Sequence, residues 1–248
     1  MEETARLEIH GNVARLTLNR PDARNALSIE LLHALHARAD ELGRRSDVVV
    51  AVLAGEGKSF CAGMDLKAVL NEPGAPERLL SSLAEFTIKL RALPQITVAS
   101  VQGAAIGGGC GLACVCDFAV THADAKIGYP EVDLGVCPAV VAPWLVRRVG
   151  AGRARRILLS GGLMSGQRAF EEGLVTQVVA DLGSLDGAVS ALVERLAQGG
   201  VAALRATKAL LNEIDGSNDG AIVRRGAELS ARVLQSDEAR MRLREKLK

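Results

Sequence analysis

Hydrophobic and polar residues alternate at the start of the chain and then recur at helical spacing. Residues 7–10 and 13–18 follow a period of two on either side of Gly11 and Asn12, which predicts a β-hairpin. After Ser28, apolar residues recur on one helical face as far as Gly43, which predicts a helix capped by Ser28. The chain is therefore expected to begin with an antiparallel hairpin and an amphipathic helix.

The middle of the chain alternates between apolar strands and helical patterns. Residues 48–53 are apolar throughout, as in a strand covered on both faces, and 96–101 form a second apolar strand. A helical pattern over 77–93 separates them, and this alternation indicates right-handed crossovers in a mostly parallel sheet. After about residue 180 the strand signals stop. We therefore expect an α/β core over residues 1–180 and an all-helical region over 181–248, with helices at 184–198, 201–214, 221–234 and 237–248.

Composition and charge exclude several classes of protein. The chain has 30 basic and 29 acidic residues, so it lacks the charge excess of a dedicated nucleic-acid binder. Aromatic residues make up only 2% of the chain, which also argues against base-stacking surfaces. The five cysteines are odd in number and lie in apolar or glycine-rich runs, as is typical of reduced thiols in the cytoplasm. We therefore expect a cytoplasmic protein with no nucleic-acid partner.

One apolar stretch raises the question of a membrane span. No charged residue lies between Arg91 and Asp117, which is long enough to cross a bilayer. Pro94 and five glycines interrupt the stretch, and the acidic N-terminus does not resemble a signal peptide. We interpret the stretch as a buried strand followed by a glycine turn, and expect no membrane partner.

Small residues follow both apolar strands. Residues 59–66 come after the first strand and residues 103–111 after the second, where open parallel sheets place their ligands. Two such loops could direct two backbone N–H groups at one oxygen, forming an oxyanion hole suited to an enolate or a tetrahedral intermediate. A second interpretation, that the glycines only allow tight packing of helix on sheet, has about equal weight.

A third segment, residues 128–138, contains the best candidate for proton transfer. Glu131 follows a proline among apolar and small residues, where burial would raise the pKa of its carboxyl toward a useful range. The alternative is an ordinary exposed glutamate. Asp133 is expected to be solvated or a structural partner. The histidines and cysteines form no metal-ligand pattern, and no GxSxG nucleophile elbow, P-loop or correctly spaced GxGxxG is present.

Several motifs together resemble a known family. In chain order they are Asn19-Arg20-Pro21 with Asn25-Ala26-Leu27, Phe60 with Ala62-Gly63 and Asp65-Leu66, residues 103–109, Cys116-Asp117, and Pro130-Glu131 with Leu134-Gly135. This order and spacing resemble the enoyl-CoA hydratase/isomerase (crotonase) superfamily from about Leu7 to about Ala239. The resemblance implies a ββα spiral core with a C-terminal helical trimerisation region, assembled as a homotrimer or hexamer. It also implies an acyl-CoA substrate of fatty acid metabolism and no metal or redox cofactor, with coenzyme A carried by the substrate.

The resemblance assigns roles to particular residues. The N–H groups of Met64 and Gly108 would form the oxyanion hole for the thioester oxygen, where one donor contributes about 3–4 kcal/mol. Glu131 would be the catalytic acid/base. The remaining residues would contact coenzyme A: Ala62, Asp65 and Leu66 beside its adenine and pantetheine, and Arg24 from an early loop.

Two departures from the family pattern leave the reaction open. Gly111 and Ala139, both expected to face the substrate, stand where other members carry a second acid. A single glutamate suits a hydratase in which Glu131 both activates water and protonates the substrate. It also suits an isomerase, in which one base moves a proton between two carbons. The stretch from Pro130 to Pro143 also resembles a hydratase branch acting on branched glutaconyl-type esters. A non-catalytic or acyl-carrier-binding scaffold is the alternative from another class.

Overall fold

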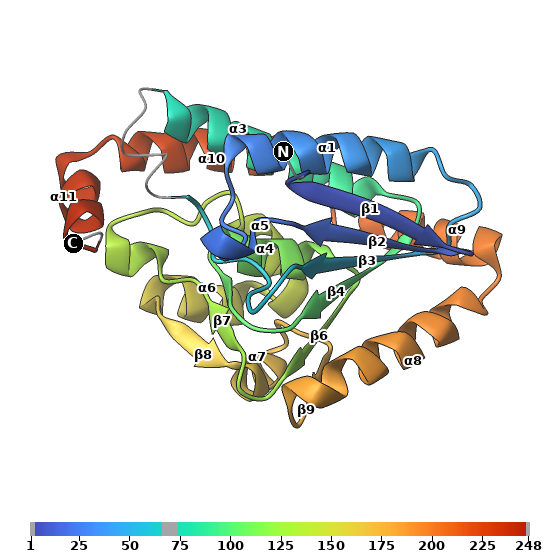
Figure 1. Cartoon of the computed structure of the whole chain (residues 1–248). Helices are drawn as coiled ribbons and strands as arrows, with labels where there is room; N and C mark the ends of the chain where they lie inside the picture. The colour runs from blue at the N-terminus through green and yellow to red at the C-terminus, as the bar shows by residue number, and fades with distance from the viewer. Residues whose placement is uncertain (1–2, 66–73, 247–248) are drawn as a thin grey trace.

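A mostly parallel sheet forms the centre of the molecule. The computed structural model describes residues 3–65 and 74–246, so Leu66, an expected substrate contact, lies outside the described residues. The strands are β1 (Ala5–His10), β2 (Val13–Leu18), β3 (Val50–Gly55), β4 (Ile96–Val101), β6 (Phe118–His122) and β9 (Gln177–Val179). They lie in the order β1-β2-β3-β4-β6-β9, and every neighbouring pair is parallel except the β1–β2 hairpin (Figure 1). The predicted hairpin and parallel sheet are confirmed.

A smaller sheet lies beside the carboxyl ends of these strands. It consists of β5 (Ala105–Ile106), β7 (Lys126–Gly128) and β8 (Leu163–Ser165), in the order β5-β7-β8. Strand β5 is parallel to β7, and β7 is antiparallel to β8. Because β7 leads directly into the segment that contains Glu131, this sheet fixes where that segment begins.

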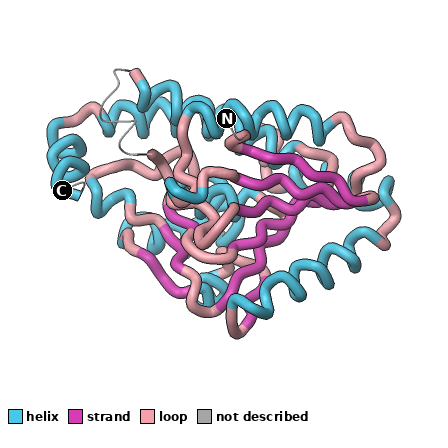
Figure 2. Tube along the Cα trace, in the orientation of Figure 1, coloured by secondary structure: helices cyan, strands magenta, loops and turns pink. Residues whose placement is uncertain are grey.

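Helices cover both faces of the central sheet. On one face lie α1 (Ile29–Gly43), α3 (Ala75–Ala92) and α4 (Gly108–Val115), whose apolar residues join Leu53 and Val101 in the main core. Ser28 caps α1 as predicted, because its Oγ accepts a hydrogen bond from Leu31 N at 3.1 Å. The tube in Figure 2, in the orientation of Figure 1, shows α1 and α3 above the strands.

The opposite face is covered by α8 (Leu185–Ala197). Its buried Leu185 and Val189 pack with Val52, Val98 and other valines of the central strands in a second apolar cluster. This explains why residues 48–53 are apolar at successive positions, since both faces of β3 are buried. Observed β3 is shifted by two residues from the predicted strand.

The remaining helices connect the sheets and complete the C-terminal region. The all-helical C-terminal region is confirmed, and α10 packs on α3 of the same chain. The boundary at residue 180 stays a prediction. Within the described residues, no helix is long and apolar enough to span a membrane. These remaining elements are α5 (Ala142–Val149), α6 (Ala151–Ser160), α7 (Gly166–Glu172), α9 (Val201–Ile214), α10 (Ala221–Leu234), α11 (Asp237–Lys246) and the 3-10 turns η1 (Pro21–Ala23), η2 (Glu131–Leu134) and η3 (Leu182–Ser184).

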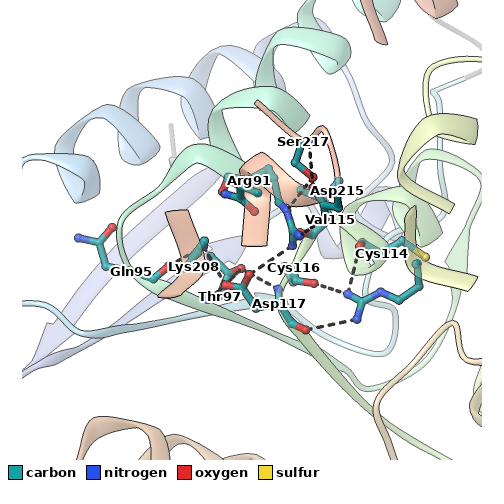
Figure 3. A network of polar contacts seen from close by, with 12 residues as sticks. Arg91, Gln95, Thr97, Cys114, Val115, Cys116, Asp117, Lys208, Asp215 and Ser217 are labelled. Atoms are coloured by element: carbon teal, nitrogen blue, oxygen red, sulfur yellow. Dashed lines mark hydrogen bonds and ion pairs between the residues drawn. The ribbon is translucent and has the colours of Figure 1, made fainter. Parts of the chain in front are cut away.

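A partly buried group of charged residues joins the C-terminal helices to the sheet (Figure 3). Asp117 Oδ2 accepts hydrogen bonds from Lys208 Nζ and Thr97 N, both at 2.8 Å. Asp117 Oδ1 accepts from Arg91 at 3.2 Å, and Arg91 also pairs with Asp215 at 2.9 Å. The Lys208 side chain is only 6% exposed, and burial lowers the pKa of its ammonium group while Asp117 opposes this shift. The network thereby links α3, α9 and the start of β6.

We expect Asp117→Asn to lower the free energy of unfolding by about 3–5 kcal/mol, because it leaves the buried Lys208 without its carboxylate partner. Urea unfolding at neutral pH measures this loss. The control is Asp47→Asn, which breaks an exposed pair with Arg45 and should leave the midpoint unchanged. Equal effects of the two variants would show that Asp117 is not a structural anchor.

Candidate active site

The loops that follow β3 and β4 are joined backbone to backbone. Cys61 N donates to Ala104 O at 2.9 Å, and Ile106 N donates to Cys61 O at 3.0 Å. The first loop is joined in the same way to the chain before α1, because Leu27 N donates to Gly63 O at 2.7 Å. Three segments that are distant in sequence therefore meet at the carboxyl edge of the sheet, where the sequence predicts ligand binding.

Glycine is required where these loops approach each other most closely. A Cβ atom on Gly63, which has φ +89°, would stand 2.7 Å from Ile106 O. A Cβ on Gly109 would collide with the carbonyl oxygen of Cys61. Of the two interpretations of the glycines, close packing is thus observed, and it brings the two loops together instead of excluding a site between them.

Met64 and Gly108 line the same cavity, and the backbone N–H groups of both are available as donors. In the bridge between Leu27 and Met64, the bonds are made by Gly63 O and Asp65 N, which leaves the Met64 N–H directed away from Leu27. Gly108 is the first residue of α4, so its N–H has no partner four residues earlier. Within the described chain, neither N–H donates to a backbone carbonyl. The geometry is that of two available donors, and their role as an oxyanion hole stays a prediction.

Glu131 lies across the cavity, in the first position of η2. Its Oε1 stands 2.8 Å from where a Cβ on Gly107 would be, so the carboxylate lies against the start of α4. Its Oε2 is buried and has no hydrogen-bond partner among the described residues. Burial raises the pKa of the Glu131 carboxyl to about 7. The carboxylate of Glu131 is thus buried although the residue as a whole is partly exposed, and its role in proton transfer stays a prediction.

The cavity between these groups is small and mostly apolar, with a volume of about 90 Å³. One wall is Leu80 and Leu83 of α3, and the other is formed by loop residues between Val136 and Val141. Ser230 of α10 contributes the only hydroxyl among the described residues that line it. Sequence reasoning did not find Ser230, although a serine within the apolar face of a predicted helix was an available signal.

Of the described residues expected to contact coenzyme A, only Ala62 lines the cavity, and the others lie next to it in the chain or across a backbone hydrogen bond. Ala62 N donates to Arg24 O at 3.0 Å, so the backbone of Arg24 adjoins the first loop. Asp65 forms an ion pair with Arg20 at 3.2 Å, which gives it a structural partner. Contacts of these residues with a substrate stay predictions.

The two positions that depart from the family pattern do not line the cavity. A Cβ atom on Gly111 would collide with Cγ1 of Val141, so that side chain fills the space next to the helix. Ala139 N donates to Ser230 Oγ at 3.2 Å. Their expected contact with substrate stays a prediction.

Asp133, in contrast to Glu131, is a structural partner. Its Oδ2 accepts a hydrogen bond from Gly162 N at 2.9 Å. This bond ties the Glu131 turn to the end of α6.

Elsewhere in the described residues, all cysteines are free, and no three His, Cys, Asp or Glu side chains are grouped so that they could hold a metal ion.

Fold and site together define a class: an α/β protein in which two backbone N–H donors and one buried carboxylate surround an apolar cavity. A family model described as enoyl-CoA hydratase/isomerase matches residues 8–247. The chain belongs to the enoyl-CoA hydratase/isomerase family and is an enzyme.

Individual relatives agree with this assignment. The chain is 39% identical over 210 residues to a putative enoyl-CoA hydratase of Thermus thermophilus, covering 83% of each chain. It is 34% identical to a crotonyl-CoA hydratase of Syntrophomonas wolfei, over 84% of this chain and 80% of that protein. The structure of Pseudomonas aeruginosa AtuE is 37% identical with a TM-score of 0.82, covering 96% of this chain and 93% of AtuE. The crotonase-like fold predicted from the sequence is confirmed.

We expect Glu131→Gln to stabilise the protein at pH 8 by on the order of 3 kcal/mol and to have little effect near pH 4.5. The folded-state pKa is raised, so the folded protein holds a proton that the unfolded chain releases between pH 4.5 and 7. The free energy of unfolding of the parent protein therefore falls across this window relative to that of the variant. Chemical unfolding at several pH values checks this, and a constant difference between the two proteins would contradict a buried carboxyl.

Proposed function

We propose that this enzyme hydrates a short 2-enoyl-CoA thioester. The observation that supports the proposal is that Met64, Gly108 and Glu131 line one cavity and that the N–H groups of Met64 and Gly108 donate to no backbone carbonyl of the described chain. The thioester oxygen would accept hydrogen bonds from both N–H groups. These two hydrogen bonds would become stronger as negative charge develops on the thioester oxygen, which lowers the barrier to forming an enolate.

Glu131 would serve as base and then as acid. Its ionised carboxylate takes a proton from water as the water oxygen bonds to C3 of the substrate, and the C2–C3 π electrons move into the enolate. The protonated carboxyl then returns a proton to C2. A pKa of about 7 suits both steps near neutral pH, because neither protonation state is strongly disfavoured. Hydration is not a net oxidation or reduction, so the proposal involves no redox cofactor.

The cavity supports a small hydrocarbon acyl group. Its volume of about 90 Å³ is below the roughly 150 Å³ of a cavity that holds benzene, and its lining is mainly apolar. Coenzyme A would extend from the thioester along the loop containing Ala62 and Asp65, with Arg24 beside it and Leu66 following in the chain.

We expect the parent protein to consume the ultraviolet absorbance of crotonyl-CoA, and Glu131→Gln to lower kcat by about 10²–10⁴-fold while CoA-ester binding changes only a few-fold. The value of kcat/KM should rise with pH through about 7, because the free enzyme needs the ionised carboxylate. The matched control is Asp133→Asn in the same turn, which should retain most activity because the amide oxygen of asparagine can still accept the hydrogen bond from Gly162 N that holds the turn.

A 3-enoyl-CoA ester tested in parallel separates the alternative reactions. A gain of conjugated absorbance from this ester, without loss from crotonyl-CoA, would identify an isomerase that uses the same glutamate. A glutaconyl-type ester consumed in preference to crotonyl-CoA would assign the branched-substrate reaction. No change that depends on Glu131 with any ester would contradict the catalytic proposal and favour a scaffold.

We also propose that the enzyme assembles as a trimer or a hexamer. Helix α9 exposes Leu210, Leu211 and Ile214, and a separate surface exposes Leu159 and Phe170. Figure 1 shows α9 well apart from α6 and α7, which carry the second pair. Two different apolar surfaces on one chain suit the head-to-tail contacts of a closed ring.

Analytical ultracentrifugation should therefore give a mass three or six times that of the 26.0 kDa chain. Ile214→Glu places a charge on the exposed face of α9 and should shift the protein toward smaller species. Circular dichroism should confirm that the variant remains folded. A monomeric parent protein at micromolar concentration would contradict the assembly.

A further inference from the structure

Helix α10 contacts both walls of the acyl cavity, although it begins about ninety residues after Glu131. On one side it packs along α3, which supplies Leu80 and Leu83. Arg224 on α10 pairs with Glu85 on α3 through two hydrogen bonds, of 2.6 and 3.0 Å. The position of α10 is therefore coupled to the α3 wall.

The other side of α10 binds the loop that forms the opposite wall. Ser230 Oγ donates to Cys137 O at 2.7 Å and accepts from Ala139 N at 3.2 Å. One helical turn earlier, a Cβ atom on Gly226 would collide with Ala139 O, so the backbone of the helix lies directly against this loop. The loop is thus held at two successive turns of α10.

Because Ser230 is buried, its hydroxyl depends on these two hydrogen bonds for partners. The residue is 1% exposed on a helical face that is otherwise apolar, including Ala227 and Leu234. A buried hydroxyl without partners is costly, and a serine in a helix often bonds to its own preceding turn. Here the hydroxyl bonds to the loop instead, and satisfies the carbonyl of Cys137, which lines the cavity, and the N–H of Ala139 two residues later.

We infer that Ser230 is a positioning residue that sets the depth of the acyl cavity, and with it the preference for short acyl chains, by holding residues 137–140 against α10. Cys137, Pro138 and Val140 line the cavity directly, so a shift of this loop changes the space beside Glu131. The same loop begins at Val136, whose N–H donates to Glu131 O at 2.8 Å. Ser230 itself is not assigned a role in proton transfer.

The inference rests on the proposed hydration activity, and the first test measures that activity with a short and a longer ester. For Ser230→Ala, we expect kcat/KM for 2-octenoyl-CoA relative to crotonyl-CoA to rise about tenfold over the parent protein, because the freed wall retreats. The acidic limb of the pH profile should also move to lower pH, because water admitted beside Glu131 reduces the desolvation of its carboxylate.

Two variants separate positioning from a loss of stability. Ser230→Thr keeps the hydroxyl and should restore both the parent selectivity and the parent pH profile. Ser165→Ala removes a similar bond, to Arg168 N at the start of α7, and should lower stability without changing either readout. If Ser230→Ala keeps the parent selectivity and pH profile, as Ser165→Ala should, the inference is wrong.

A measurement without turnover distinguishes failure of this inference from failure of the proposed function. The pH window over which Glu131→Gln stabilises the protein should narrow in the Ser230→Ala background, because Glu131 is then better hydrated. If the parent protein hydrates no ester but the window narrows, the proposed function fails and the positioning role stands. An unchanged window, with or without turnover, overturns the positioning role.

Discussion

The site depends on one steric constraint, the close approach of the loops after β3 and β4. At Gly63 and Gly109 the facing carbonyl oxygens leave no room for a side chain. This proximity allows Cys61 to bond through both its N–H and its carbonyl to the chain around β5. Met64 and Gly108 line one cavity on backbones that these bonds hold in place, so no mobile side chain is needed to position their N–H groups.

The environment of Glu131 opposes its ionisation, and the surrounding structure must keep it buried. The carboxylate has one oxygen against Gly107 and the other without a partner in the described chain. The turn is held by the bond between Asp133 and Gly162 and by Arg242 of α11, which donates to Asp133 O at 3.4 Å. A carboxylate whose ionised form is destabilised by burial is typical of active sites. The bonds made by Asp133 offset part of this cost by holding the turn in place.

The C-terminal helices contribute to the core and to the site as well as to the surface. Helix α8 covers one face of the sheet. Helix α9 is anchored to Asp117 by its Lys208. Helix α10 holds both cavity walls. The division between a core and a C-terminal region is therefore one of secondary structure, since these helices bury apolar and charged groups of the first part of the chain.

The sequence by itself determined the hairpin, the two apolar strands β3 and β4, helices α1, α3 and α8 to α11, and the candidacy of Glu131, because alternation and caps follow from local backbone geometry. Glycine runs also marked where two loops would meet. Only the tertiary structure decided that Val141 fills the space beside Gly111, that Asp65 pairs with Arg20, and that Ser230 lies at the cavity. Each of these contacts joins residues thirty or more positions apart, a separation of about eight helical turns or more along the chain. Helix packing sets such distances, and no local pattern of residues encodes them.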